Sequence, residues 1–175
     1  MPPRLRWSPR TDVRTTAAAD APPRHEWGGA SASAICVCTA RVGTVKRSGL
    51  LHADLAGHLA RLGHTDLVVV ADRGLPLPPG VPVVDLALVP GVVDLRTVLD
   101  AVLAEIVVQS HTVAAEATGG PFPIWLDERS DALGERHLTS HDELKAMLPG
   151  VRLAVRTGEE TPYANVLLEC GVPFG

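Results

Sequence analysis

The chain has 175 residues, a length that suits a single domain, and 46% of them are hydrophobic, which is enough to build a core. Its 16 basic and 20 acidic residues give a formal net charge of −4, and no basic stretch is sustained. The sequence therefore argues against a nucleic-acid partner, and no apolar run approaches the roughly 18 residues that a membrane-spanning helix needs.

The three cysteines, Cys36, Cys38 and Cys170, form neither a C-x-x-C pair nor an even set. An odd number of unpatterned cysteines is typical of a reducing compartment. We therefore predict inert thiols and no disulfide.

The composition changes near Val45. Residues 1–44 are rich in Arg, Ala, Thr, Ser and Pro without apolar periodicity, so we predict a disordered N-terminal extension followed by one folded domain over 45–175. An export or transit segment is a weaker alternative, because the apolar stretch is short and interrupted by Ser and Thr. A third interpretation is that the natural protein starts near Val45.

The folded part begins with a helix, predicted from the spacing of Leu55, Leu59 and Leu62, with Asp54 as N-cap and Gly63 as the stop. The apolar runs 67–71 and 83–89 predict two strands, the first buried on both faces. Asp94 then opens a helix whose apolar positions are Leu95, Val98, Leu99, Val102 and Leu103.

Further along, the pattern predicts a strand over about 110–116, a loop over 119–123, a short helix over 127–133 and a helix starting near His141. The segments VRLAV and NVLLEC predict the last two strands. Helices that alternate with buried strands indicate a layered α/β/α protein with a mostly parallel or mixed central sheet.

A histidine and an aspartate bracket the first predicted strand. Asp72 follows it, where ligands gather in open α/β sheets, whereas His64 precedes it. Five residues of strand span roughly 17 Å, so the two side chains meet only if a loop folds back or a neighbouring subunit completes the site. The alternatives are a histidine that caps a helix end and an aspartate that bonds to the backbone of a turn.

Two later segments carry further polar candidates. His141 lies at a helix start in TSHDELK, and Tyr163, the only tyrosine, lies near Asn165 in TPYAN. Hydroxyl and amide groups suit a polyhydroxylated ligand. The alternatives are a surface histidine, a tyrosine that fills the core and an asparagine in a turn.

The sequence has no phosphate loop, dinucleotide fingerprint or G-x-S-x-G elbow. It has no H-E-x-x-H pattern either, and we predict no zinc site. The pattern by itself names no reaction.

Four segments resemble the D-ribose pyranase family, within the ribose/fucose mutarotase superfamily. In chain order they are KRSGLLHADLAGHLARLGH, LGHTDLVVVADRGLPLP, TSHDELK and RTGEETPYANVLLECGVPF. The resemblance covers about Val45 to Phe174. It departs from the family in the extra 44 residues and in the proline- and glycine-interrupted region from Gly119 to Arg136, where relatives carry a longer helix.

The resemblance implies a cytoplasmic isomerase without cofactor or metal that interconverts the β-pyranose and β-furanose forms of D-ribose. Its catalytic histidine matches His64, and its substrate-binding positions match Asp72, His141 and the run Tyr163, Ala164 and Asn165. The family assembles as homo-oligomers, typically decamers, with sites at subunit interfaces.

The chemistry agrees with these residue types, because ring opening and reclosure need a group that gives and takes a proton near neutral pH, as a histidine does. Two alternatives are a mutarotase of another sugar such as L-fucose, and a ribose-binding accessory protein without activity.

Overall fold

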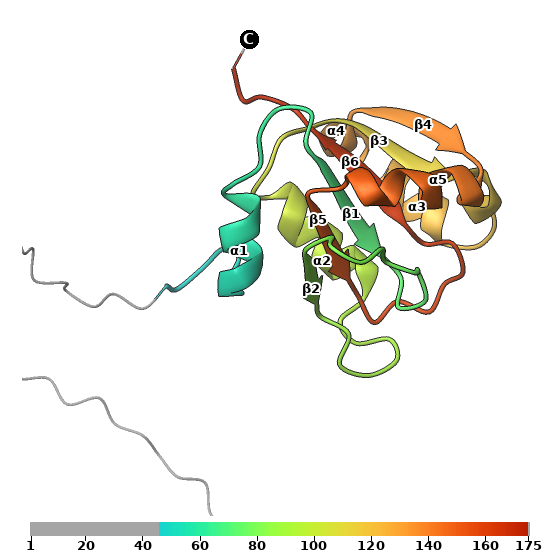
Figure 1. Ribbon diagram of the computed structural model, residues 1–175, viewed down its shortest axis with the longest axis horizontal. Helices are drawn as coiled ribbons and strands as arrows, with labels where there is room; N and C mark the ends of the chain where they lie inside the picture. Colours follow the sequence, from blue (N-terminus) through green and yellow to red (C-terminus); the bar gives the residue numbers. More distant parts are fainter. Residues whose placement is uncertain (1–45, 175) are drawn as a thin grey trace, which may run out of the picture. The chain divides into compact units, whose positions relative to one another are not determined.

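The computed structural model describes residues 46–174, which form a six-stranded mixed sheet with helices on both faces (Figure 1). The strands lie in the order β2-β5-β1-β6-β3-β4. Their bounds are β1 (Leu67–Ala71), β2 (Val83–Asp85), β3 (Val108–Ala114), β4 (Glu135–Thr139), β5 (Leu153–Arg156) and β6 (Val166–Cys170). The α/β class predicted from the sequence is confirmed, and the sheet is of the mixed kind.

Strand direction gives the sheet two unlike ends. Strands β1, β2 and β5 run parallel, β3 runs parallel to β4, and β6 runs antiparallel to its neighbours β1 and β3. The segments that follow five of the strands therefore emerge at the same end as the segment that enters β6. The segments that enter β1 and β3 lie at the opposite end.

Strand β1 is buried on both faces, as predicted, and covers the predicted range. Val68 and Val70 face a core formed with helices α1 to α4, while Val69 and Ala71 face a second core formed with helix α5. This alternation divides the apolar run between two layers and leaves no face of the strand for solvent.

Helix α1 (Ala53–Leu59) begins two residues earlier than a helix capped by Asp54 would. Asp54 is not the N-cap: His52 is, and its Nδ1 accepts the N–H of Leu55 at 3.2 Å. The regular helix also ends at Leu59, before Gly63. The next helix, α2 (Leu95–Leu103), confirms its prediction, since the Asp94 side chain accepts the N–H of Thr97.

Strand β2 is shorter than the predicted run 83–89. It ends at Asp85, whose Oδ1 accepts the N–H of Ala87 at 3.0 Å. This side-chain turn diverts the chain from the sheet after three residues. The rest of the apolar run continues into an exposed loop in which Val89 and Val92 form an isolated bridge.

The middle of the chain differs most from prediction. Strand β3 is followed by the 3₁₀ helix η1 (Ala115–Thr118), and the expected loop at 119–123 already contains the start of helix α3 (Phe122–Asp127). Pro123 lies in the first turn, where no backbone N–H is needed, so it does not prevent the helix. The expected helix 127–133 is divided between α3 and α4 (Ser130–Leu133), and strand β4 was not predicted.

The C-terminal third follows the prediction closely. Helix α5 (His141–Met147) starts with a capping box, in which Ser140 and Glu143 exchange side-chain-to-backbone hydrogen bonds. The 3₁₀ helix η2 (Leu148–Gly150) leads into β5, and β6 lies between β1 and β3 in the sheet.

None of the helices within residues 46–174 has the length and apolar character that a membrane span requires. The predicted extension over 1–44 lies outside the described residues.

Candidate functional site

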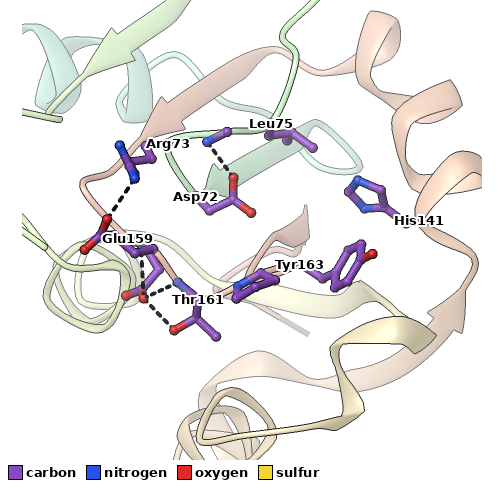
Figure 2. A pocket seen from close by; sticks show the side chains of 10 residues that line it. Asp72, Arg73, Leu75, His141, Glu159, Thr161 and Tyr163 are labelled. Atoms are coloured by element: carbon purple, nitrogen blue, oxygen red, sulfur yellow. Dashed lines mark hydrogen bonds and ion pairs between the residues drawn. The ribbon is translucent and has the colours of Figure 1, made fainter. Parts of the chain in front are cut away.

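A pocket of about 390 Å³ opens at the end of the sheet where β1, β5 and β4 finish (Figure 2). Asp72 to Leu75 follow β1, Glu159 to Tyr163 connect β5 to β6, and His141 follows β4. The parallel strands bring these segments together because their carboxyl ends share one edge. The lining residues are Asp72, Arg73, Gly74, Leu75, His141, Glu159, Glu160, Thr161, Pro162 and Tyr163.

Asp72 is buried at the pocket floor, and Asn165 holds it. The Asn165 Oδ1 accepts the backbone N–H of Asp72, and the Asn165 Nδ2 donates to Asp72 Oδ2, both at 3.0 Å. The other carboxylate oxygen accepts the N–H of Gly74 at 2.8 Å. A carboxylate has about four acceptor positions, so these two bonds leave capacity for the hydroxyls of a ligand.

Glu159 is a second buried carboxylate, and it orders the loop that carries Tyr163. Its Oε1 accepts the N–H and hydroxyl of Thr161 at 2.9 and 2.7 Å, while its Oε2 accepts the N–H of Leu95 at 3.4 Å. Burial alone would raise the pKa of Glu159, but these bonds outweigh it and lower the pKa. The residue therefore stays charged and acts as a fixed anchor.

Tyr163 is turned outward by a left-handed backbone, with φ at 62°, an uncommon conformation for a residue other than glycine. The residue is 41% exposed, and its ring contacts that of His141 edge to face with centroids 5.0 Å apart. The interpretation as a core tyrosine is therefore wrong. The next residue, Ala164, is fully buried in the core and is not among the residues that line the pocket.

His141 is the first residue of α5, and its backbone N–H donates to both carboxylate oxygens of Glu116 at 3.0 Å. This bond lowers the pKa of Glu116. The imidazole Nδ1 of His141 is buried and has no hydrogen-bond partner among the described residues. A buried unpaired nitrogen is costly, and a ligand hydroxyl in this pocket would satisfy it.

His64 lies outside this pocket. It precedes β1, at the opposite end of the sheet, and its Nε2 lies 2.9 Å from the Oε1 of Gln109. It lines a different hollow of about 450 Å³, with Glu105, Cys170 and Phe174 among its neighbours. The structure therefore brings together Asp72, His141, Tyr163 and Asn165, and it does not bring His64 to them within one chain.

The described residues contain no group of three or more His, Cys, Asp or Glu side chains that could hold a metal ion. His137 and His141 have the spacing H-x-x-x-H, but His137 lies in β4 and His141 begins α5, so they do not share a helical face.

Burial raises the pKa of the Cys170 thiol to about 11, with Asp66 and Glu169 adding to the effect. Cys36 and Cys38 lie outside the described residues.

The model of the RbsD/FucU transport protein family matches residues 45–173. The chain belongs to the RbsD/FucU family. Among its curated RbsD/FucU relatives, the D-ribose pyranase of Cutibacterium acnes is 52% identical over 130 residues, which are 74% of this chain and 100% of the relative. The D-ribose pyranase 1 of Rubrobacter xylanophilus is 50% identical with the same coverage.

Solved structures of the RbsD/FucU family share the fold. Bacillus subtilis RbsD, determined in complex with D-ribose, superposes with a TM-score of 0.70 at 38% identity, over 74% of this chain and 99% of that one. FucU from Bifidobacterium longum superposes with a TM-score of 0.58 at 20% identity, over 70% of this chain and 96% of that one. At that identity the likeness concerns the fold alone.

Four polar residues that line the pocket are absent from the predicted site: Arg73, Glu159, Glu160 and Thr161. Arg73 and Glu160 form an ion pair of 2.8 Å across the pocket between the loops after β1 and β5. The sequence could have indicated these four residues, because they follow two predicted strands directly. It does not indicate which of several charged residues in one loop direct their side chains into the pocket.

Proposed function

We propose that this chain is a D-ribose pyranase, an isomerase that interconverts β-D-ribopyranose and β-D-ribofuranose in the breakdown of ribose. The observation that carries the proposal is the match, at about half identity, to curated D-ribose pyranases over their whole length. A ribose-bound relative with the same fold supports D-ribose as the ligand.

The charge of the pocket favours a neutral sugar. Its lining contains the carboxylates of Asp72, Glu159 and Glu160 and only one guanidinium, that of Arg73, which is already paired. A phosphate group would meet net repulsion there. Free acceptor positions on Asp72, the unpaired Nδ1 of His141 and the exposed side chain of Tyr163 instead suit sugar hydroxyls.

In the proposed reaction, the anomeric hydroxyl loses its proton while the ring oxygen gains one, and the C–O bond between the anomeric carbon and the ring oxygen breaks. The open aldehyde then closes through a different hydroxyl, with the two proton transfers reversed. His64 gives and takes the proton on the ring oxygen, which is worth about 10²–10⁴-fold. Asp72, His141 and Tyr163 hold the hydroxyls, and one of these three groups accepts the proton of the anomeric hydroxyl and returns it on reclosure. The reaction uses no redox step.

We place His64 of one copy against the pocket of another, because one chain holds them at opposite ends of β1. The surface beside strand β4 supports contact between copies: β4 is an exposed edge, and Leu138 on it is 62% exposed. An apolar hollow of about 120 Å³ lies next to Leu138 and is lined by Val113, Phe122 and Leu126 among others. The proposal thus includes a homo-oligomer, a decamer by family resemblance, in the cytoplasm.

Saturation-transfer NMR on equilibrated D-ribose tests the activity. Adding the protein should accelerate exchange between the pyranose and furanose anomers, and L-fucose should show little acceleration. Failure to accelerate ribose exchange would contradict the proposal.

His64→Ala should reduce the acceleration about 10²-fold or more. His58→Ala on α1 is the matched control and should leave the rate unchanged. A fully active His64→Ala protein would remove the proton-transfer role from His64.

A further inference from the structure

The turn that carries His64 is fixed on both sides. Asp66 Oδ2 accepts the N–H of Gly63 at 2.8 Å, the N–H of Asp66 donates to the Gly63 carbonyl, and the N–H of Thr65 donates to the carbonyl of Cys170 at 2.9 Å. Thr65 takes a left-handed φ of 66° inside this turn. The backbone of His64 is therefore held, and its side-chain torsions are the freedom that remains.

Gln109 removes part of that freedom. Its Oε1 lies 2.9 Å from the Nε2 of His64, 45 residues away in the chain. An amide oxygen accepts hydrogen bonds and cannot donate them, so this contact requires the proton of a neutral imidazole to be on Nε2. The Nδ1 is then the nitrogen left to exchange a proton with another group.

The backbone at Gln109 is irregular, which directs this side chain out of the regular strand pattern. Val108 pairs with Cys170 and Ser110 pairs with Glu169, so Gln109 is one extra residue opposite β6, a β-bulge. Bulges re-aim side chains and are frequent next to active sites.

Two glycines leave room for this bulge. A Cβ on Gly134 would lie 2.1 Å from the Gln109 carbonyl oxygen, and one on Gly171 would lie 3.3 Å from the Gln109 Cβ. The close approach of both backbones keeps Gln109 in its place beside His64.

We propose that Gln109 is a positioning residue that holds the imidazole of His64 in the Nε2–H tautomer and directs proton transfer through Nδ1. This inference rests on the proposed function, in which His64 exchanges a proton with the sugar. The other titratable groups near the turn are engaged elsewhere: Glu105 accepts the N–H of Leu50, and Asp66 accepts that of Gly63. Cys170 remains a neutral thiol near neutral pH.

Two variants of the full chain separate the parts of this role. Gln109→Leu removes the acceptor and should lower kcat for ribose exchange at least about tenfold with little change in KM, because orientation is lost while the sugar pocket is intact. Gln109→Glu keeps the acceptor and adds a charge that favours the imidazolium, so it should retain activity with a pH–rate profile moved to higher pH. Val107→Ala, in the same hollow, is the control and should change neither.

Long-range ¹H–¹⁵N NMR of the histidine side chains, recorded without ribose, reads the tautomer directly. The Nε2–H form should dominate in the unmodified protein and in Val107→Ala, and a mixture should appear in Gln109→Leu. A dominant Nδ1–H form in the unmodified protein, an unchanged tautomer and kcat in Gln109→Leu, or an unmoved pH–rate profile in Gln109→Glu would overturn the positioning role. An active His64→Ala protein would instead reject the proton-transfer role of His64, whatever the tautomer.

Discussion

Asn165 is a predicted substrate-binding residue whose polar side-chain atoms are directed to Asp72. Its amide oxygen and nitrogen are both bonded to Asp72, and the side chain is fully buried. The sequence suggested a direct contact with a sugar hydroxyl. The observed bonds favour a role in which Asn165 orients the carboxylate that contacts the sugar, which remains a proposal.

We expect Asn165→Ala to lower the free energy of unfolding by about 1–3 kcal/mol, because it leaves the buried N–H of Asp72 without an acceptor. Ribose exchange should slow as well, since Asp72 loses the group that fixes its orientation. Urea denaturation and NMR exchange measure the two effects. Unchanged stability and activity would mean that the pair has no energetic role.

His111 is a buried histidine that the site does not use. Its Nδ1 donates to the Leu133 carbonyl at 3.0 Å, and its Nε2 accepts from Arg136 at 3.1 Å. Burial lowers its pKa, the bond to Leu133 opposes this effect, and the nearby charges of Arg136 and His137 add to the lowering. The ring is therefore held neutral in the folded state.

This lowered pKa predicts a pH-dependent stability. The unfolded chain takes up a proton at His111 as the pH falls through about 6.5, while the folded chain does not, so stability should decline from there down to the folded-state pKa. His111→Gln should flatten that part of the curve in denaturation experiments between pH 7.5 and 5. Glu143, whose pKa is lowered to about 2 by Thr139 and Ser140, changes the free energy of unfolding only below about pH 4.5. If stability falls equally with pH in the unmodified protein and in His111→Gln, the assignment to His111 is contradicted.

At the scale of elements, the pocket depends on the loop after β5 lying against the loop before α2. The N–H of Gly158 donates to the Val93 carbonyl, and its carbonyl accepts the N–H of Gly91, both at 2.7 Å. A Cβ on Gly158 would lie 2.4 Å from the Val92 carbonyl oxygen. Only glycine permits this approach, and the next residue is the buried anchor Glu159.

Gly158→Ala should therefore destabilise the fold by about 1–3 kcal/mol or more, because the added Cβ meets the backbone of Val92, which cannot move aside as a flexible side chain could. It should also weaken ribose binding by shifting Glu159. Gly150→Ala is the matched control, since nothing lies within 4 Å of its added Cβ. Thermal unfolding and ribose titration of both variants make the comparison, and equal behaviour would remove the packing argument.

At the scale of the whole molecule, the two ends of β1 carry different parts of the proposed site. Asp72 lies at the carboxyl end with the pocket, and His64 lies at the amino end with Gln109. The strand between them spans roughly 17 Å and is buried on both faces, so neither end can bend toward the other.

Mixing two inactive variants tests whether copies share a site. His64→Ala lacks the proton donor, and His141→Ala lacks a pocket residue. When the two are refolded together at equal amounts, about a quarter of the shared sites should contain both histidines and regain activity. Native mass spectrometry verifies that mixed oligomers form. Mixed oligomers without activity would show that the two histidines do not meet across copies.

Local sequence patterns were sufficient to predict those elements that an apolar run or a capping side chain defines. The strand 67–71, the helix capped by Asp94 and the helix after Ser140 were all predicted, because apolar runs and capping side chains act within a few residues. Strand β4 was missed since its residues are mostly exposed and its order comes from pairing with β3. The N-cap of α1 was assigned to Asp54 instead of His52, because the apolar spacing of the helix does not decide which of two nearby polar side chains accepts the N–H of Leu55.

The sequence by itself determined the class of fold and the candidate residues of the site, since periodicity, capping and family resemblance are written in short segments. The tertiary structure decided which of those residues meet. Asp72, His141, Tyr163 and Asn165 lie together because five strand ends and the entry to β6 share one end of the sheet. His64 is separated from them because it enters β1 at the other end, and no local pattern encodes that distance.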